Sequence, residues 1–391
     1  MMVVRYLIFI CVGLCALANG ASSQTASSPA RPQASPNAVF PGPNDVWKLP
    51  DRNRVNEGTV TVITAPAGGA TAVFGSDMAR VLDDDASVRV LGVLGKGPVR
   101  NVTDILYLKS IDMGAVAADV PEFYKLQYDI PDITSNLRYI AKLYHNEIHI
   151  IAKKSIKSIF DLEGKRIVSP TDVGYYSAKV IFSRLGINAT FDYRTDDARA
   201  IQKLIDGEAD AYITSTGKVF QLARNIKNEN RALHLVPIDY DARLQDLYLP
   251  TSLSADDYPN LLSPGETIDT IATSVLLVSF NWPENSERYN KVARFVDAFF
   301  SKIDEFRKPP RHPKWSEASI SAVIPGWQRF KAADDWLIQH NMSPSTQANE
   351  IQKLRFNRFL AEEGPAIGEG APSRDELYRR FLEWQKQKAR P

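Results

Sequence analysis

Three ionisable residues alternate along one short segment of the chain: His145, Glu147 and His149. On a β-strand, successive side chains point to opposite faces, so these three would share one face. Two histidines and one carboxylate on one face form a ligand set that binds iron and similar metal ions. The neighbouring isoleucines instead indicate a strand in the protein interior, where the polar side chains form hydrogen bonds. We favour this second interpretation, because such metal ligands usually come from separate elements.

A glycine pair, Gly95 and Gly97, follows a segment typical of a strand and precedes one typical of a helix. This is the context of a dinucleotide-binding fingerprint, but Arg100 occupies the position of the third glycine. The sequence contains no nucleophile-elbow, zinc-protease or phosphate-loop motif. We therefore expect a protein that is not an enzyme and that uses neither a cofactor nor a metal ion.

Glycine-rich or polar loops precede three predicted helices, at residues 65–71, 95–101 and 170–177. The free N–H groups and the dipole at a helix N-terminus favour an anion without any catalytic group. In an open α/β sheet such helix starts lie at the carboxyl ends of the strands, where ligands bind. Each loop alone could be an ordinary turn, but three of them favour a binding cleft for an anion.

Short β-branched segments alternate with segments of helical periodicity. Strands are predicted at residues 59–64, 87–94, 113–116, 166–169, 190–193, 211–214 and 233–237. One helix is predicted to begin at Pro98, and two others, at residues 177–185 and 198–205, to end at Gly186 and Gly207. The alternation indicates an α/β fold with largely parallel sheets. Two longer extended segments, residues 138–153 and 270–280, favour two chain crossings between lobes.

The C-terminal part has a different character. Ser343 and Pro344 predict the cap and first position of a helix that runs to about residue 363. After a Gly/Pro-rich break, Ser373 and Glu376 fit a capping box, and an apolar stripe follows. The predicted hairpin either straps the body, which is the commoner outcome, or docks a partner.

Composition narrows the function classes. The chain has 391 residues, of which 44% are hydrophobic, as is usual for a folded protein. Lysine and arginine total 47 and aspartate and glutamate 46, so no charge excess favours nucleic acid.

The first twenty residues resemble a secretory signal. Arg5 precedes an apolar run at residues 6–18 that ends in an A-x-A-like site. We expect cleavage and a periplasmic protein, with uncleaved anchoring as the alternative. Both cysteines, Cys11 and Cys15, lie inside this signal, so the mature protein is expected to contain no thiol. Residues 21–56 are predicted to form a disordered linker.

Between residues 57 and 340 the order of short strings resembles the TAXI family of solute-binding proteins of TRAP transporters. The strings that carry the resemblance are Thr64, Gly68-Gly69-Ala70-Thr71, Gly75, Gly97-Pro98-Val99-Arg100-Asn101, Ala118-Asp119-Val120, Leu143-Tyr144-His145-Asn146-Glu147, Asp161-Leu162-Glu163-Gly164-Lys165-Arg166, Asp206-Gly207-Glu208-Ala209-Asp210-Ala211, Thr216-Gly217 and Val323-Ile324-Pro325-Gly326-Trp327. Each string alone is weak, but their order and spacing are fairly specific.

The resemblance implies a two-lobed periplasmic-binding-protein fold of type II, with hinge strands and an added helical tail. The lobes would comprise residues 57–140 with 270–342, and residues 141–269, followed by the extension at 343–391. The implied function is capture of a small organic anion, carboxylate or amino-acid-like, by a monomer that serves the membrane permease of a TRAP transporter. The implied role of Glu147 is structural, beside the hinge.

The chain departs from the family pattern in its ligand loops. Pro98 and Arg100 replace a serine and a glutamate, and Ala65-Pro66 stands where two glycines are usual. These changes keep open a second function, a regulatory or assembly protein that docks a partner through its C-terminal helices. The expected ligand contacts are Thr64, Gly69, Thr71, Lys96, Arg100, Asn101, Tyr175, Tyr176, Ser177 and Thr216. Of the two cations, Arg100 is the better candidate, because a guanidinium can hold a carboxylate with two hydrogen bonds.

Overall fold

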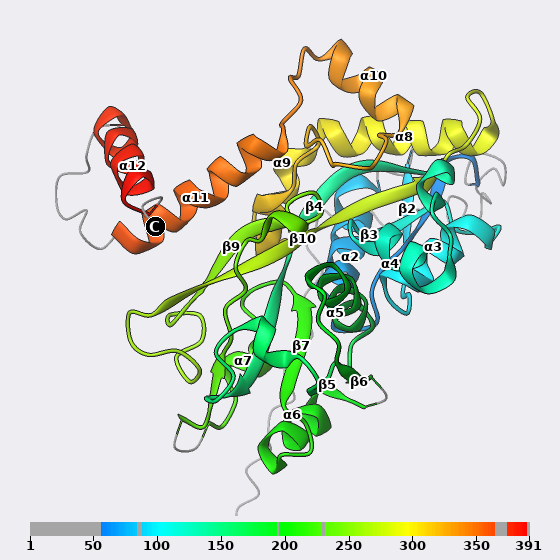
Figure 1. Ribbon diagram of the computed structural model, residues 1–391. Helices are drawn as coiled ribbons and strands as arrows, with labels where there is room; N and C mark the ends of the chain where they lie inside the picture. Colours follow the sequence, from blue (N-terminus) through cyan, green and yellow to red (C-terminus); the bar gives the residue numbers. More distant parts are fainter. Residues whose placement is uncertain (1–55, 84–87, 194, 229–230, 364–373, 389–391) are drawn as a thin grey trace, which may run out of the picture. The chain divides into compact units, whose positions relative to one another are not determined.

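The computed structural model describes residues 56–83, 88–193, 195–228, 231–363 and 374–388 (Figure 1). The predicted signal, almost all of the predicted linker and the Gly/Pro-rich break with Ser373 lie outside these residues. The strands are β1 (Thr59–Ile63), β2 (Arg89–Val93), β3 (Met113–Ala117), β4 (Leu137–Lys153), β5 (Arg166–Val168), β6 (Thr190–Asp192), β7 (Ala211–Thr216), β8 (Leu233–Leu235), β9 (Leu249–Ser254) and β10 (Thr267–Phe280).

The two halves of the sheet have the same strand order. In the first, β2, β1 and β3 are parallel, and antiparallel β10 separates β3 from β4. In the second, β6, β5 and β7 are parallel, and antiparallel β4 separates β7 from β8. The long strands β4 and β10 belong to both halves. This topology confirms the predicted two-lobed α/β fold of the periplasmic-binding-protein type.

Glu147 marks the place where β4 passes from one half to the other. It is in register with Ala272 of β10 on one side and with Thr216 of β7 on the other. The residues of β4 before it pair with β10, and those after it pair with β7 and β8. Glu147 therefore lies where the two lobes join.

Helices follow the strands in both halves. They are α2 (Ala70–Leu82), α3 (Pro98–Tyr107), α4 (Val120–Tyr128), α5 (Asp172–Leu185), α6 (Asp197–Asp206), α7 (Gln221–Arg224), α8 (Glu287–Ser301), α9 (Ile303–Phe306), α10 (Lys331–Gln339), α11 (Gln347–Glu363) and α12 (Arg374–Lys388). Pro98 occupies the first turn of α3 as predicted, and the left-handed residues Gly186 and Gly207 end α5 and α6.

Two predicted helix starts were wrong. Helix α5 begins at Asp172 and not at Ser177, because the Thr171 side chain accepts a hydrogen bond from the Gly174 N–H and caps the helix early. Helix α11 begins at Gln347 and not at Ser343. Ser345 first forms a β-bridge with Ala322, which keeps this segment extended until the bridge is complete.

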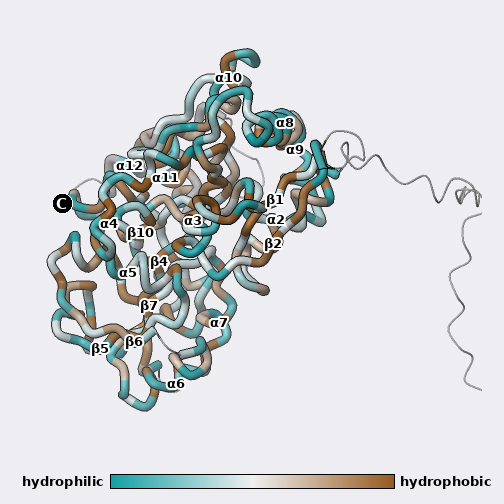
Figure 2. The backbone as a smooth tube through the Cα atoms, turned by 90° about the vertical axis from the view of Figure 1, so that its right-hand side faces the viewer, coloured by the Kyte–Doolittle hydropathy of each residue, from teal (hydrophilic) through white to brown (hydrophobic). Residues whose placement is uncertain are grey.

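One hydrophobic core extends through both halves. Val102 and Ile105 of α3 and Ile181 and Phe182 of α5 belong to the same buried cluster. A second cluster joins β1 and β2 to α8, and Figure 2 shows hydrophobic residues along these two strands.

The C-terminal hairpin has a small core of its own. Phe381 and Trp384 of the predicted stripe are buried and pack with Phe359 of α11. Within the part of the chain that the structure describes, no helix combines the length and the hydropathy needed to cross a bilayer.

Candidate functional site

The starts of two helices meet where the lobes face each other. A Cβ atom on Gly97, the residue before α3, would lie 3.1 Å from the Cβ of Asp172, the first residue of α5. Gly97 has a φ of 127°, a conformation that side chains rarely adopt, so both space and backbone favour glycine here. The positive ends of α3 in the first lobe and α5 in the second therefore lie together, with the Asp172 carboxylate between them.

Thr64 and Asn101 tie this region to the first lobe. The Thr64 hydroxyl donates a hydrogen bond of 3.0 Å to the Val93 carbonyl. The Asn101 side-chain amide donates to the Thr64 carbonyl at 3.0 Å and to the Ala115 carbonyl at 2.8 Å. Both side chains are buried, and Asn101 Oδ1 accepts no hydrogen bond from any residue that the structure describes. The two predicted contacts are therefore adjacent and hold the ends of β1, β2 and β3.

The two predicted cations are not held in a buried clamp. The Arg100 guanidinium pairs with Asp104 one turn further along α3, at 3.2 Å, and its side chain is 59% exposed. Lys96 is exposed as well. Thus the helix ends, and not a buried arginine, provide the positive potential at this point.

The other predicted residues lie around the junction. Gly69 precedes α2, and Thr71 in its first turn is buried against the Tyr144 hydroxyl. Thr216, at the end of β7, is in register with Glu147. Tyr175 and Tyr176 lie in the first turns of α5, and the Tyr176 ring packs on that of Phe123, with centroids 4.4 Å apart.

Ser177 contacts a buried carboxylate of the other lobe. Its hydroxyl donates a hydrogen bond of 2.7 Å to Asp119 Oδ2, and the Tyr248 hydroxyl donates another of 2.9 Å to the same oxygen. Burial raises the pKa of Asp119, while the two hydroxyls lower it by a smaller amount. Nearby, Arg184 of α5 forms an ion pair with Glu122 of α4 at 3.3 Å. The lobes are therefore in direct contact at this edge of the junction.

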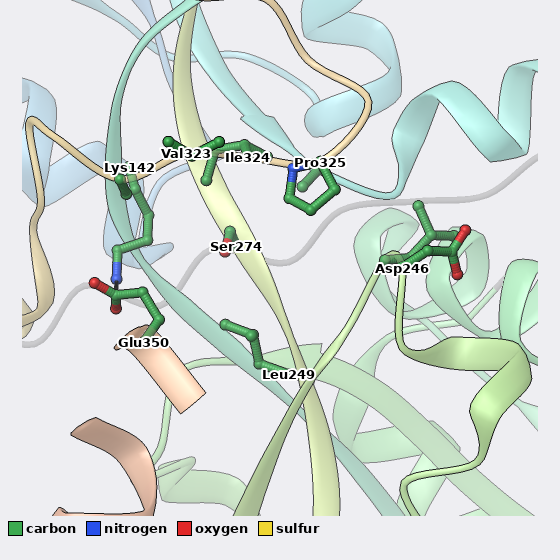
Figure 3. A pocket seen from close by; sticks show the side chains of 11 residues that line it. Lys142, Asp246, Leu249, Ser274, Val323, Ile324, Pro325 and Glu350 are labelled. Carbon is green, nitrogen blue, oxygen red and sulfur yellow. Dashed lines mark hydrogen bonds and ion pairs between the residues drawn. The ribbon is translucent and has the colours of Figure 1, made fainter. Parts of the chain in front are cut away.

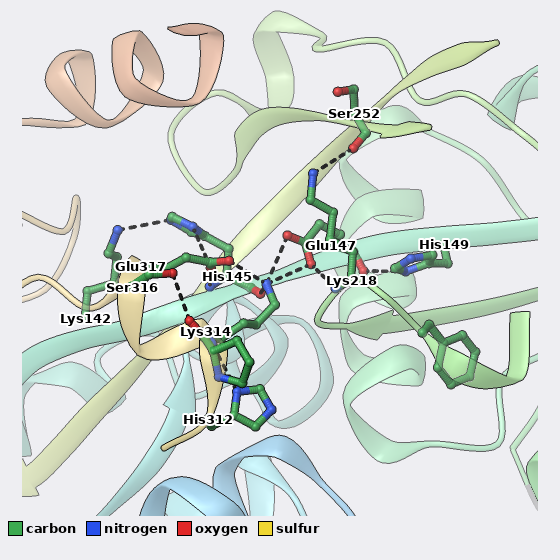
Figure 4. Close-up of polar contacts among 12 residues, drawn as sticks. Lys142, His145, Glu147, His149, Lys218, Ser252, His312, Lys314, Ser316 and Glu317 are labelled. Atoms are coloured by element: carbon green, nitrogen blue, oxygen red, sulfur yellow. Dashed lines mark hydrogen bonds and ion pairs between the residues drawn. The ribbon is translucent and has the colours of Figure 1, made fainter. Parts of the chain in front are cut away.

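On the other side, a polar group that we call the Glu147 cluster joins the lobes (Figure 4). It comprises Glu147, His145, Lys218, Lys314 and Glu317. The Lys314 ammonium lies 3.2 Å from Glu147 Oε1 and 2.9 Å from Glu317 Oε1, and it donates to the His145 carbonyl at 2.9 Å. The Lys218 N–H donates to Glu147 Oε2 at 2.7 Å. The two carboxylates thus share the Lys314 ammonium, whereas the Lys218 ammonium donates to the Ser252 carbonyl at 3.2 Å.

The Lys314 side chain reaches the second lobe from the short 3₁₀ helix Pro313–Glu317. A Cβ atom on Gly217, just after β7, would lie 2.6 Å from Lys314 Cε. Burial raises the pKa of Glu147 even though this ammonium is close. Burial alone would raise the pKa of Glu317 too, but the contacts from His145 and Lys314 bring it below its usual range. Lys314 is therefore the central cation of the cluster.

The geometry favours hydrogen bonding over metal binding for the alternating trio. His149 Nδ1 lies 2.9 Å from the Glu147 carbonyl, which can only accept, so Nδ1 carries the proton. His149 Nε2 then accepts from the Tyr258 hydroxyl at 2.7 Å. Burial lowers the pKa of His149 to about 3 and that of His145 to about 4. Among the described residues no group of three potential ligands is placed to hold a metal ion.

A cavity of about 990 Å³ lies beside the Glu147 cluster, between the body and the C-terminal helices. Its charged lining residues are Glu147, Asp239, Asp256, Asp257, Glu266, Asp269, Glu317, Lys218, Arg355 and Arg358. Carboxylates outnumber cations, so this cavity disfavours an anionic solute. None of the ten predicted contact residues lines this cavity. None of them lines the smaller cavity beside Lys142 and Glu350 either.

The Glu147 cluster was only partly visible in the sequence. His145 and Glu147 were found by their alternation, whereas Lys314 and Glu317 come from a segment without a motif. Asp119 belongs to the string Ala118-Asp119-Val120 and is not among the predicted contacts. Only the fold could bring these side chains together.

Three solved structures are similar to the described chain at low identity. The ligand-binding core of GluR0 from Nostoc punctiforme, in complex with L-glutamate, has 14% identity and a TM-score of 0.39, covering 63% of this chain and 93% of that one. An amino acid transporter substrate-binding protein from Streptococcus pneumoniae, bound to L-arginine, has 13% identity and a TM-score of 0.38, covering 65% and 93%. A TctC solute-binding protein from Polaromonas has 14% identity and a TM-score of 0.38, covering 63% and 88%.

These TM-scores are below 0.5, so the two-lobed fold is inferred from the strand order of this chain and not from these structures. The family is shown by sequence, since a family model matches residues 62–306, from β1 to the end of α9. The chain belongs to the NMT1-like family.

Proposed function

We propose that the protein is a periplasmic solute-binding protein that captures a small organic solute with a carboxylate group between its two lobes. The observation that carries the proposal is the meeting of the α3 and α5 N-termini at Gly97 and Asp172. A carboxylate at this point would accept hydrogen bonds from free N–H groups of both lobes. Such a ligand would stabilise the closed arrangement because it contacts both sides.

Asp172 indicates which carboxylate solutes fit best. Its carboxylate lies against the start of α3, and burial raises its pKa. A purely anionic solute would be repelled by this group, whereas the ammonium of an amino acid would pair with it. Within the proposed class, amino-acid-like solutes are therefore favoured over simple dicarboxylates.

The proposed contacts are Thr64, Gly69, Thr71, Lys96, Arg100, Asn101, Tyr175, Tyr176, Ser177 and Thr216. Entry of the solute requires the lobes to separate where Ser177 now contacts Asp119 and Tyr176 packs on Phe123. The crossing strands β4 and β10 would carry this hinge motion. The role requires no cofactor and no chemical step.

We further propose delivery to the membrane permease of a TRAP-type transporter by a monomer of this chain. Support comes from the strings shared with the TAXI family and from the predicted secretory signal.

The test is a thermal-shift screen of the full chain against amino acids and organic acids, followed by calorimetry of the hits. At least one amino-acid-like compound should raise the melting temperature. Asp172→Asn should weaken the binding of amino acids and strengthen that of dicarboxylates, whereas Asp304→Asn, at an exposed position of α9, should change neither. If no compound of these classes binds, solute capture is wrong.

A further inference from the structure

A buried lysine on the crossing strand β4 faces a carboxylate of the C-terminal extension (Figure 3). Lys142 Nζ lies 2.6 Å from Glu350 Oε2, and the Lys142 side chain is 1% exposed. Taking an ammonium out of water is strongly unfavourable unless a carboxylate compensates it. Glu350 therefore supplies a charge that the protein body requires at this point.

The carboxylate comes from a segment outside the two lobes. Glu350 lies in the first turn of α11, whose N-terminal end is favourable for an acidic residue. The Ser345 hydroxyl donates to Glu350 Oε1 at 3.2 Å, and the Ser345 backbone pairs with residues 321–323. A second, more exposed ion pair joins Arg358 of the same helix to Asp269. The extension thus places one carboxylate into the body from outside.

The pair lines a small cavity at the junction of the lobes. Its volume is about 30 Å³, and its walls include Ala118 after β3, Ser274 of β10, Leu249 of β9 and Ile324. This is room for a water molecule or two with Glu350 in place. If the Glu350 side chain withdrew, the space would admit a carboxylate and the carbon atoms next to it.

The neighbouring titratable groups do not compete for this role. His145 Nε2 is 3.4 Å from Lys142 Nζ, and burial together with this ammonium lowers the pKa of His145 to about 4. The imidazole is therefore neutral at pH 7. Asp246 lines the far side of the same cavity, away from Lys142 (Figure 3). The Asp246 carboxylate pairs with Arg184 at 2.7 Å.

We propose that Lys142 and this cavity form a binding subsite for the carboxylate of a small organic acid, and that Glu350 of the extension occupies it as an internal competitor. The subsite is distinct from the proposed cleft at α3 and α5 and does not depend on it. An internal carboxylate has a high effective concentration, so the intact chain should bind external carboxylates weakly here.

The test asks whether an added carboxylate restores the stability that is lost when the Glu350 side chain is truncated. Glu350→Ala leaves Lys142 without this carboxylate and opens the space beside it. We expect a melting temperature lower by about 5 °C than that of the natural chain. Sodium propionate at 50 mM should recover at least half of this loss, whereas sodium chloride at the same ionic strength should recover little. The natural chain and Arg358→Gln, which breaks only the exposed pair, should respond equally to both salts.

The double variant Lys142→Met with Glu350→Ala removes the cation as well and should not respond to propionate. Equal responses of Glu350→Ala to both salts, or an unchanged propionate response in the double variant, would overturn the proposal. If Glu350→Ala does not fold, Glu350→Gln replaces it. Calorimetry should then give a propionate affinity at least tenfold above that of the natural chain, and equal affinities would overturn the proposal. Asp172→Asn combined with Glu350→Ala should keep the propionate response, because Asp172 lies in the proposed cleft and not in this subsite. Failure of the subsite and failure of the proposed solute cleft are therefore distinguishable.

Discussion

The Ser177 hydroxyl of α5 donates a hydrogen bond of 2.7 Å to Asp119 at the start of α4, so a buried carboxylate of one lobe is held by a hydroxyl of the other. Tyr248 supplies a second hydroxyl to the same oxygen. Hydroxyl donors compensate a buried negative charge less well than a cation does. This contact is therefore sensitive to pH and well suited to open when the lobes separate.

Asp119→Asn tests this contact. Burial raises the pKa of Asp119 in the folded protein above its unfolded value near 3.8. The stability that the protonated carboxyl contributes is therefore complete below about pH 3.8, and it is lost as the pH rises through the folded pKa. The difference in unfolding free energy between Asp119→Asn and the natural chain should therefore grow in favour of the variant as the pH rises from 4 to 8. Urea unfolding at several pH values measures it. Ser177→Ala keeps the carboxylate but removes a hydroxyl that lowers its pKa, so the pH dependence should persist and become larger. A difference between Asp119→Asn and the natural chain that is independent of pH would show that the pKa of Asp119 is not perturbed.

The buried histidines predict the opposite slope at acidic pH. Burial lowers the pKa of His149 to about 3 and that of His145 to about 4, from 6.5 in the unfolded chain. Between these values the unfolded state binds more protons, so stability is present above about pH 6.5 and is lost as the pH falls toward 4. Each histidine should contribute a slope of roughly 1 kcal/mol per pH unit.

Replacement of His149 by glutamine should reduce that slope, as measured by urea unfolding between pH 4.5 and 7. His340→Gln, at an exposed position, is the matched control and should leave it unchanged. Identical slopes in His149→Gln and the natural chain would contradict the burial argument.

Lys314→Met removes the central cation of the Glu147 cluster. Two buried or half-buried carboxylates, Glu147 and Glu317, would lose their shared ammonium, and unfolding free energy should fall by about 3–5 kcal/mol. The further change Glu147→Gln should recover part of this loss, because it removes one uncompensated charge. Denaturant titration of the single and double variants measures both effects. A Lys314→Met variant as stable as the natural chain would show that the cluster has little role in holding the lobes.

Deletion of residues 343–391 distinguishes a strap from a docking arm. The deletion removes Glu350 from Lys142 and Arg358 from Asp269, so we expect a melting temperature lower by several degrees. Lys142→Met in the shortened chain should recover part of this loss. Unchanged stability together with loss of a retrieved partner would favour the alternative function, a regulatory or assembly protein.

Local signals in the sequence predicted most elements of the two lobes. Pro98, Gly186 and Gly207 act within one helix turn, so their positions set the ends of α3, α5 and α6 directly. The start of α11 depended instead on the bridge between Ser345 and Ala322, a contact between segments that no local pattern reports.

The site was less predictable than the fold for the same reason. Thr64 and Asn101 lie beside the strand ends, where an α/β fold places its ligand loops, and the structure brings them together. The chemistry of Arg100 suits a carboxylate ligand, but Asp104, one turn away, already pairs with its guanidinium. Lys142 contacts Glu350 only because helix α11 packs against the body, and the spacing of residues in the sequence does not indicate this packing.

The most direct test of the account is isothermal titration calorimetry of the full chain with amino acids and small organic acids. Solute capture predicts saturable binding of at least one of them in the micromolar range or tighter. Gly97→Val should abolish that binding, because its side chain would collide with Asp172 and strain the start of α3. Absence of any binding by a folded natural chain, or binding that survives Gly97→Val unchanged, would contradict capture between the two lobes.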